Sequence, residues 1–173
     1  MNSVVYIPYG KRKCNNMNKK KTIINILLII TPLLIGIAST ILTKDMMQEY
    51  GTLNKPFLAP PTMLFPIAWT ILYILMGVGA ALIYSKDEYS QYRSVGLTLH
   101  FTQLILNFFW SIIFFNMGKY VFAFIWLVIL WLVVFSMIMN YRKVSRTAFF
   151  LNIPYIVWLT FAGYLNLAVA ILN

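Results

Sequence analysis

Five long stretches of apolar residues run along the chain, and short polar segments separate them. Each stretch is close to or above the roughly 20 residues that an α-helix needs to cross a bilayer. The stretches are continuously apolar and do not alternate with a period of two, so helices are favoured over the strands of a membrane barrel. The pattern predicts an all-α integral membrane protein, a bundle of five transmembrane helices with spans at about 22–43, 65–84, 94–115, 119–139 and 147–172.

Composition supports this class of protein. Of the 173 residues, 61% are hydrophobic and 10% are charged, whereas roughly 25% are charged in soluble domains. The net charge is +10, but the basic residues stand at the ends of apolar stretches, where they face lipid headgroups. A lipid bilayer is therefore the expected partner, and nucleic acid is not.

The N-terminal segment 1–21 carries six basic and no acidic residues. It is predicted to be a disordered cytoplasmic tail ahead of a membrane domain at 22–173. A basic segment before an apolar one also resembles a signal peptide. An uncleaved span is favoured because its polar and small residues share one narrow helical face, and its proline is expected to kink the helix. These residues are Asn25, Pro32, Gly36, Ser39 and Thr43.

The orientation follows from the distribution of Lys and Arg. With the N-terminus inside the cell, 11 of the 14 basic residues lie on the cytoplasmic side and 3 lie on the other side. Cytoplasmic loops carry the excess of Lys and Arg in membrane proteins. A multi-pass protein is therefore expected, with the N-terminus in the cytoplasm and the first loop and the C-terminus outside.

The first loop, at 44–64, is rich in proline and apolar residues. Proline fixes φ and disfavours helix at the preceding residue, so residues 56–61 are predicted not to be regular helix. Pro66 fits the first turn of the next helix, where its missing N–H has no consequence. This predicts a stiff apolar loop that leads directly into the second span. An interfacial or re-entrant connector that binds no ligand is the alternative.

Polar residues at membrane depth are costly and often functional. Three spans each collect polar, aromatic or small residues on one helical face. If those faces turn inward, they form a cavity with aromatic walls that suits a flat, mostly apolar ligand. The residues are Trp69 and Tyr73 in the second span; His100, Gln103, Asn107, Trp110 and Ser111 in the third; and Tyr155, Trp158, Ala162 and Asn166 in the fifth.

Structural roles explain several of these residues equally well. Asn107 and Asn166 fit hydrogen bonding between helices as well as ligand contact. His100 is expected at the membrane interface and not as a haem ligand. One histidine, one cysteine and no carboxylate at membrane depth predict neither a metal site nor an acid–base pair. Gly77 and Ala81 predict a close helix contact.

Three segments carry a family resemblance: LNKPFLAPPTMLFPIAWTILYILMG at 53–77, QLILNFFWS at 103–111 and PYIVWLTFAGYLN at 154–166. They resemble the signature of the TspO/MBR family, the tryptophan-rich sensory proteins or translocator proteins. The similarity extends over roughly residues 22–173, in order and with family-like spacing. It implies a five-helix bundle, usually a homodimer, with a pocket capped by the loop between the first two helices.

The resemblance also implies ligands and a site. The family binds porphyrins and haem as ligands, with no required cofactor, and some members bind sterols and benzodiazepine-site drugs. The helical-face argument adds Tyr155 to the pocket. The residues that the motifs place in the pocket are Pro60, Trp69, Tyr73, Asn107, Trp110, Trp158 and Ala162.

The function predicted from these features is that of a membrane receptor or regulator for tetrapyrroles, linked to stress responses. One alternative is an enzyme that breaks down protoporphyrin in light, with Trp69 and Trp158 as the reacting groups. Another is a porphyrin transporter. The sequence shows no inverted repeat and no acid or base at membrane depth, so proton-coupled transport has no support from it.

Overall fold

The computed structural model describes residues 9–49, 53–54, 56–86 and 90–173. In this part of the chain all regular structure is helical, and five helices are long and apolar enough to cross a membrane. The prediction of an all-α membrane protein with five spanning helices is confirmed. The elements are α1 (Tyr9–Glu49), α2 (Leu64–Tyr84), α3 (Gln91–Ser111), the short π-helix η1 (Ile112–Asn116), α4 (Tyr120–Val144) and α5 (Arg146–Leu172).

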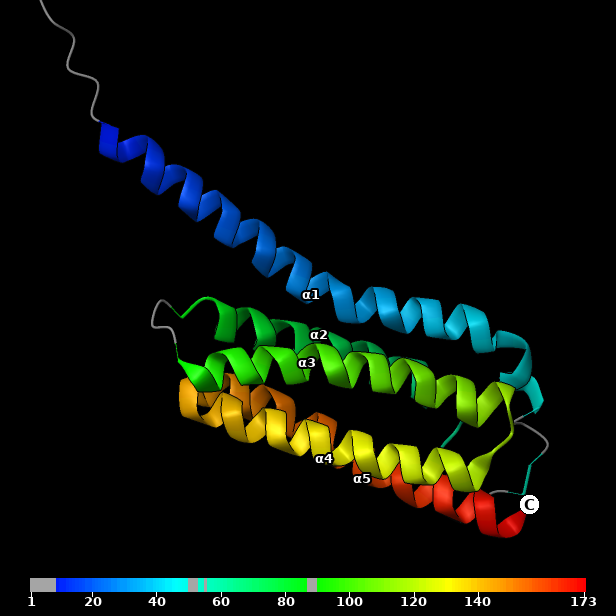
Figure 1. The fold of residues 1–173 in the computed structure, drawn as a ribbon. Helices are drawn as coiled ribbons and strands as arrows, with labels where there is room; N and C mark the ends of the chain where they lie inside the picture. The colour runs from blue at the N-terminus through cyan, green and yellow to red at the C-terminus, as the bar shows by residue number, and fades with distance from the viewer. Residues whose placement is uncertain (1–8, 50–52, 55, 87–89) are drawn as a thin grey trace, which may run out of the picture.

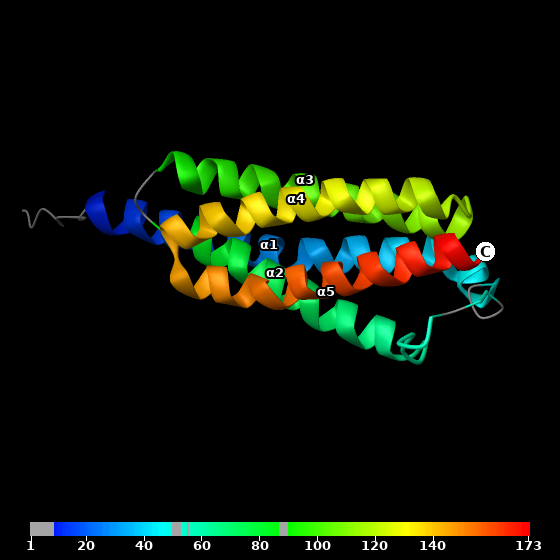
Figure 2. The ribbon, with the colours of Figure 1, turned by 90° about the horizontal axis from the view of Figure 1, so that it is seen from below.

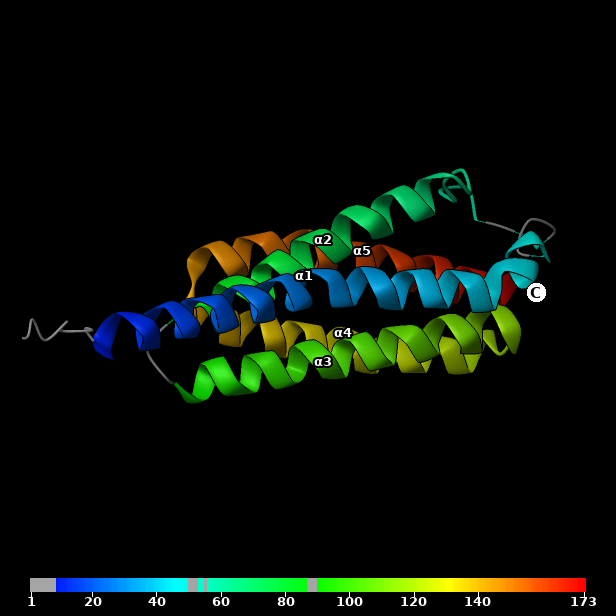
Figure 3. The ribbon, with the colours of Figure 1, turned by 90° about the horizontal axis from the view of Figure 1, so that it is seen from above.

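The five helices lie side by side along one long axis (Figure 1). Around the bundle, α1 packs on α2, α2 on α5, α5 on α4 and α4 on α3, while contacts of α1 with α3 and η1 complete the ring. The N-terminal part of α1 projects beyond the bundle, and the C-terminus lies at the opposite end, beside the α1–α2 connection (Figures 1 and 2). At that end the first half of α2 diverges from α1 and α5 (Figure 3).

Helix α1 is longer than the sequence predicted at both ends. It runs from Tyr9 to Glu49, so the predicted disordered tail at 1–21 does not describe residues 9–21, and the predicted loop at 44–64 is helical up to residue 49. Lysine is a good helix former, and the chain between Gly10 and Gly51 holds only Pro32 and Gly36 as helix-breaking residues. The helix changes direction part-way along (Figure 1), as expected for one that contains a proline. Residues 1–8 lie outside the described part.

The remaining boundaries follow the sequence pattern closely. Pro66 stands in the first turn of α2, and residues 56–61 contain a turn, in which the Ala59 N–H donates to the Pro56 carbonyl at 2.9 Å, but no helix. Helix α4 continues to Val144, five residues past the predicted end of its span at 139. Its last turn carries Arg142 and Lys143, whose charges are favourable at a helix C-terminus.

Two glycines determine how neighbouring helices pack, one in a turn and one at a helix contact. Gly118, with φ of +58°, allows the short turn between η1 and α4, so α3 and α4 pack as antiparallel neighbours as predicted. Gly77 of α2 lies against the backbone of α1, because a Cβ there would be 2.6 Å from the Ile29 Cα. This is the close helix contact expected at Gly77.

Amide side chains join the loop end of the bundle. The Asn54 N–H donates to Asn173 Oδ1 at 3.0 Å, and Asn173 Nδ2 donates to the Asn54 carbonyl at 3.1 Å. On the other side of the bundle, Asn116 Nδ2 donates to the Leu42 carbonyl at 3.0 Å. We call the Asn54–Asn173 pair the amide latch. It attaches the α1–α2 loop to the end of α5.

Candidate functional site

A cavity of about 710 Å³ lies between α1, α2, α5 and the junction of α3 with η1. Its volume is within the range of about 300 to 1,000 Å³ that is typical of small-molecule sites. It lies in the half of the bundle where α2 diverges from α1. Helix α1 contributes Gly36, Ser39, Thr40 and Thr43, and the other elements contribute Thr62, Phe65, Trp69, Tyr73, Trp110, Ser111, Phe114, Trp158, Ala162 and Asn166, among others.

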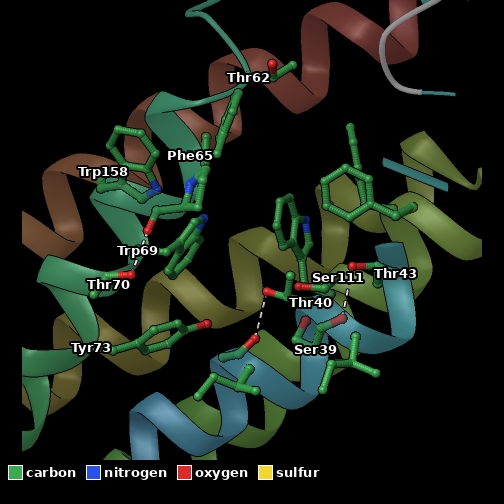
Figure 4. A pocket seen from close by; sticks show the side chains of 18 of the residues that line it. Ser39, Thr40, Thr43, Thr62, Phe65, Trp69, Thr70, Tyr73, Ser111 and Trp158 are labelled. Carbon is green, nitrogen blue, oxygen red and sulfur yellow. Dashed lines mark hydrogen bonds between the residues drawn. The ribbon is translucent and has the colours of Figure 1, made fainter. Parts of the chain in front are cut away.

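One wall of the cavity is aromatic (Figure 4). Trp69 stacks on Tyr73 with ring centroids 5.4 Å apart, and its ring meets that of Trp158 edge-on at 6.5 Å. Phe65 covers Trp158 from the start of α2, with centroids 6.1 Å apart. The buried Trp158 Nε1 has no hydrogen-bond partner among the described residues. The wall therefore offers flat π-faces, while the Trp158 N–H is buried within it.

A second aromatic group is held by an asparagine. Trp110 Nε1 donates to Asn166 Oδ1 at 3.2 Å, and Asn166 Nδ2 donates to the Tyr120 carbonyl at 2.8 Å. Trp110 also stacks on Phe114 with a centroid separation of 5.4 Å. Both polar groups of the Asn166 side chain are thus used between helices, so Asn166 joins α3, α4 and α5 at the edge of the cavity.

Behind the aromatic wall lies a layer of hydrogen-bonded polar side chains. Asn107 Nδ2 donates to the Tyr73 hydroxyl at 3.5 Å. The Tyr155 hydroxyl donates to Gln103 Oε1 at 2.8 Å, and the Tyr155 ring meets Trp69 at 6.2 Å. These bonds lie between helices and fix the rings that face the cavity.

The structure brings most of the predicted site residues together. Trp69, Tyr73, Trp110, Trp158 and Ala162 line the cavity. Asn107 and Tyr155 are buried one layer behind it, where they contact the lining side chains. Pro60 is half-buried in the loop and is not among the lining residues.

Sequence reasoning missed the contribution of α1. Gly36, Ser39, Thr40 and Thr43 line the cavity, although the cavity was predicted from the second, third and fifth spans alone. The signal was present as the stripe of small and polar residues on the first span. That stripe was interpreted as evidence for an uncleaved helix, and its direction relative to the other helices could not be derived from spacing.

His100 lies on the inward face of α3, as its shared helical face with the other polar residues predicted. Its side chain is fully buried in the bundle, and neither ring nitrogen has a hydrogen-bond partner in the described part of the chain. Its ring meets Phe101 edge-on at 5.5 Å. It shares that face with Gln103 and Asn107, and its expected depth at the membrane interface stays a prediction.

The chemistry of the lining is neutral. Among the described residues that line the cavity, none carries a charge, and none is a histidine, cysteine or methionine. Such a lining can stack on a ligand, exclude water from it and form neutral hydrogen bonds. It contains no pair of groups suited to general acid–base catalysis.

Five spanning helices around an internal cavity with one aromatic wall define an integral membrane protein with a cavity of small-molecule size. Residues 28–172 match the TspO/MBR family model, and the chain belongs to the TspO/MBR family. It is 37% identical to the tryptophan-rich protein TspO of Chlorobaculum tepidum over 142 residues. The matched region covers 82% of this chain and 90% of that protein.

The similarity extends to archaeal and animal proteins. The tryptophan-rich protein TspO of Archaeoglobus fulgidus is 35% identical over 158 residues, covering 91% of this chain and 99% of that protein. The translocator protein of Ovis aries is 36% identical over 118 residues, covering 68% of this chain and 70% of that protein. The chain is therefore a multi-pass membrane protein of a family whose members are called sensory and translocator proteins.

Proposed function

We propose that this protein is a membrane receptor or regulator that binds a porphyrin or haem in the cavity, and that it links tetrapyrrole levels to a stress response. The observation that carries the proposal is the cavity of about 710 Å³, with Trp69, Tyr73 and Trp158 on one wall and Trp110 at its edge. Aromatic side chains favour stacked and edge-on contacts with flat rings. Sterols and benzodiazepine-site drugs are further candidate ligands of the same cavity.

The neutral lining suggests how a porphyrin would be oriented. An ionised carboxylate is costly to bury without a charged or hydrogen-bonding partner. The macrocycle is therefore expected inside the cavity, with its carboxylates directed to the mouth. Ala162, 7% exposed, leaves room for the ring at the α5 side of the cavity.

Assembly and orientation form part of the proposal. We infer a homodimer with the N-terminus in the cytoplasm and the loop end outside. The orientation is supported by the excess of basic residues on the N-terminal side, 11 of 14, and by the position of the α1–α2 loop and the C-terminus at one end of the bundle (Figure 1). Accessibility labelling of Cys14 in sealed cells tests the N-terminal side.

The function is tested by titrating the detergent-solubilised protein with protoporphyrin and measuring quenching of tryptophan fluorescence. The Trp158→Ala variant is expected to bind at least tenfold more weakly, because the aromatic wall loses one of the ring faces on which the porphyrin would lie. Trp131→Ala is the matched control, since Trp131 stacks on Phe135 and is not among the lining residues. Equal binding curves for the wild type and the Trp158→Ala variant would remove the cavity as the porphyrin site.

A second function is favoured by the contact between Trp69 and Trp158, whose ring centroids are 6.5 Å apart at the cavity. Two electron-rich indoles beside a bound porphyrin would suit its light-dependent breakdown. Under illumination, loss of porphyrin absorbance should then slow in a Trp69→Phe/Trp158→Phe variant that still binds the ligand. The same rate in both proteins would leave only photochemistry of the free porphyrin.

A further inference from the structure

Across the cavity from the aromatic wall stands a group of hydroxyl side chains. Figure 4 shows Ser39, Thr40 and Thr43 of α1 beside Ser111 of α3, facing Trp69 and Tyr73. Ser39 is 6% exposed and Thr43 is 3% exposed, so two of these groups are deeply buried. We call the four residues the hydroxyl wall. The cavity is therefore aromatic on one side, and on the other side hydroxyl groups stand among apolar side chains of α1 such as Leu33, Ile37 and Ile41.

Three of the four hydroxyl protons are already used. Thr40 Oγ1 donates to the Gly36 carbonyl and Thr43 Oγ1 donates to the Ser39 carbonyl, both at 2.9 Å. Ser111 Oγ donates to the Asn107 carbonyl at 3.4 Å. A hydroxyl group has one proton and two acceptor lone pairs. A ligand in the cavity can therefore use these three hydroxyl oxygens only as acceptors.

Ser39 differs from its neighbours. Its hydroxyl makes no hydrogen bond to any described residue, although the side chain is more than nine-tenths buried and lines the cavity. The Ser39 hydroxyl oxygen is not one of the fully buried side-chain atoms that lack a partner in the described part of the chain, so the small exposed remainder of this side chain includes the oxygen, which a ligand in the cavity can reach. Thr40 and Thr43 use their protons within their own helix, whereas the Ser39 proton is free for a ligand.

We propose that the hydroxyl wall is a hydrogen-bonding subsite that takes the O–H or N–H edge of a flat, neutral ligand whose apolar face lies against the aromatic wall. The wall holds three committed acceptors and one free hydroxyl, so it favours a donor on the ligand over a carboxylate or a bare ether oxygen. The proposal rests on the proposed function in one respect: both place the ligand in this cavity. It adds which edge of the ligand faces α1 and what chemistry that edge carries.

The experiment compares three small flat probes, namely 2-naphthol, 2-methoxynaphthalene and naphthalene. They share the same ring system but differ in hydrogen bonding, since the first donates and accepts, the second only accepts and the third does neither. Binding is measured by isothermal titration of the protein in lipid nanodiscs, with empty nanodiscs as the blank. The wild type is expected to bind 2-naphthol about five- to tenfold more tightly than the other two, the range of one neutral hydrogen bond.

The variant is Ser39→Ala/Thr40→Val/Thr43→Val, which removes the three hydroxyls that α1 contributes to the wall, leaves Ser111 in place and nearly keeps the side-chain volumes. It is expected to lose most of the preference for 2-naphthol, with unchanged affinity for naphthalene. Thr31→Val is the matched control. Thr31 lies on the same helix and donates to the Leu27 carbonyl at 2.7 Å in an exposed hydrogen bond, but it is half-buried and not among the lining residues. This variant should keep the preference for 2-naphthol.

The outcomes separate the two proposals. Equal binding of the three probes by the wild type, no detectable 2-naphthol binding, or a preference that survives in the triple variant would each overturn the hydroxyl subsite. Protoporphyrin binding that depends on Trp158 would still stand in those cases. A preference for 2-naphthol that is lost in the triple variant, with no protoporphyrin binding, would keep the subsite and remove the tetrapyrrole ligand.

Discussion

Gly36 of α1 lies directly against the aromatic ring of Tyr73 of α2. A Cβ atom built on Gly36 would overlap that ring, lying 2.8 Å from its Cδ2 atom and 3.0 Å from its Cζ atom. Both residues line the cavity, and Tyr73 in turn stacks on Trp69. The absence of a side chain at one position of α1 therefore determines where the aromatic wall of α2 can stand.

Replacing Gly36 tests this relationship. In Gly36→Ala the Tyr73 ring has to move, which disturbs its stack on Trp69 and is expected to cost about 1 to 3 kcal/mol of stability, as other overpacked cores do. Protoporphyrin affinity should fall with it. Gly163→Ala is the control, since a Cβ there would lie 3.4 Å from Leu127 Cδ2, an ordinary contact. If thermal unfolding in detergent gives the same midpoint for both variants, the Gly36–Tyr73 contact does not limit the packing of α1 on α2.

The amide latch makes a prediction about the loop. Asn173→Ala removes the acceptor of the Asn54 N–H and the donor to the Asn54 carbonyl, a loss of about 1 kcal/mol for partly exposed bonds. Exchange of the Asn54 amide hydrogen and dissociation of a cavity ligand should both become roughly fivefold faster. Asn140→Ala is the control, because it removes an exposed hydrogen bond from the Asn140 side-chain amide to the Ser136 carbonyl within α4. Unchanged exchange at Asn54 would show that the latch does not hold the loop.

Asn166 is predicted to matter for stability. Asn166→Leu leaves the Trp110 N–H without its acceptor and removes the additional bond to the Tyr120 carbonyl, and a buried polar group left without a partner costs about 1 to 3 kcal/mol. The unfolding midpoint should fall clearly. Asn166→Asp keeps the acceptor for Trp110 but loses the donor to Tyr120, so it separates the two bonds. A folded Asn166→Leu protein of wild-type stability would rule out the bridging role.

The five membrane-spanning helices and most of their ends could be predicted, because they depend on local features of the sequence. Continuous apolar runs gave the spans, Pro66 fitted the first turn of α2, and the turn at Gly118 required antiparallel neighbours. The ends of α1 could not be predicted in the same way. The basic charge at 1–21 indicated disorder, but lysine and arginine are good helix formers, and residues 9–21 continue the helix of the first span.

The site was predictable only as far as helical faces allow. The shared faces of Trp69 with Tyr73, and of Trp158 with Ala162, correctly indicated the cavity lining. Spacing could not reveal which layer a residue occupies, so Asn107 and Tyr155 were grouped with the lining residues although they lie behind them. The rotation of α1 depends on the Gly36–Tyr73 and Gly77–Ile29 contacts, which exist only once the helices have packed.

Ala162 gives the most direct test of the account, because a larger side chain there fills the cavity without removing any ring or hydrogen bond. Protoporphyrin titration of Ala162→Leu should show at least tenfold weaker binding with the unfolding midpoint little changed. Ala168→Leu, at a half-buried position of the same helix that is not among the lining residues, should bind as the wild type does. Wild-type affinity in a folded Ala162→Leu protein would contradict the account and place the ligand elsewhere.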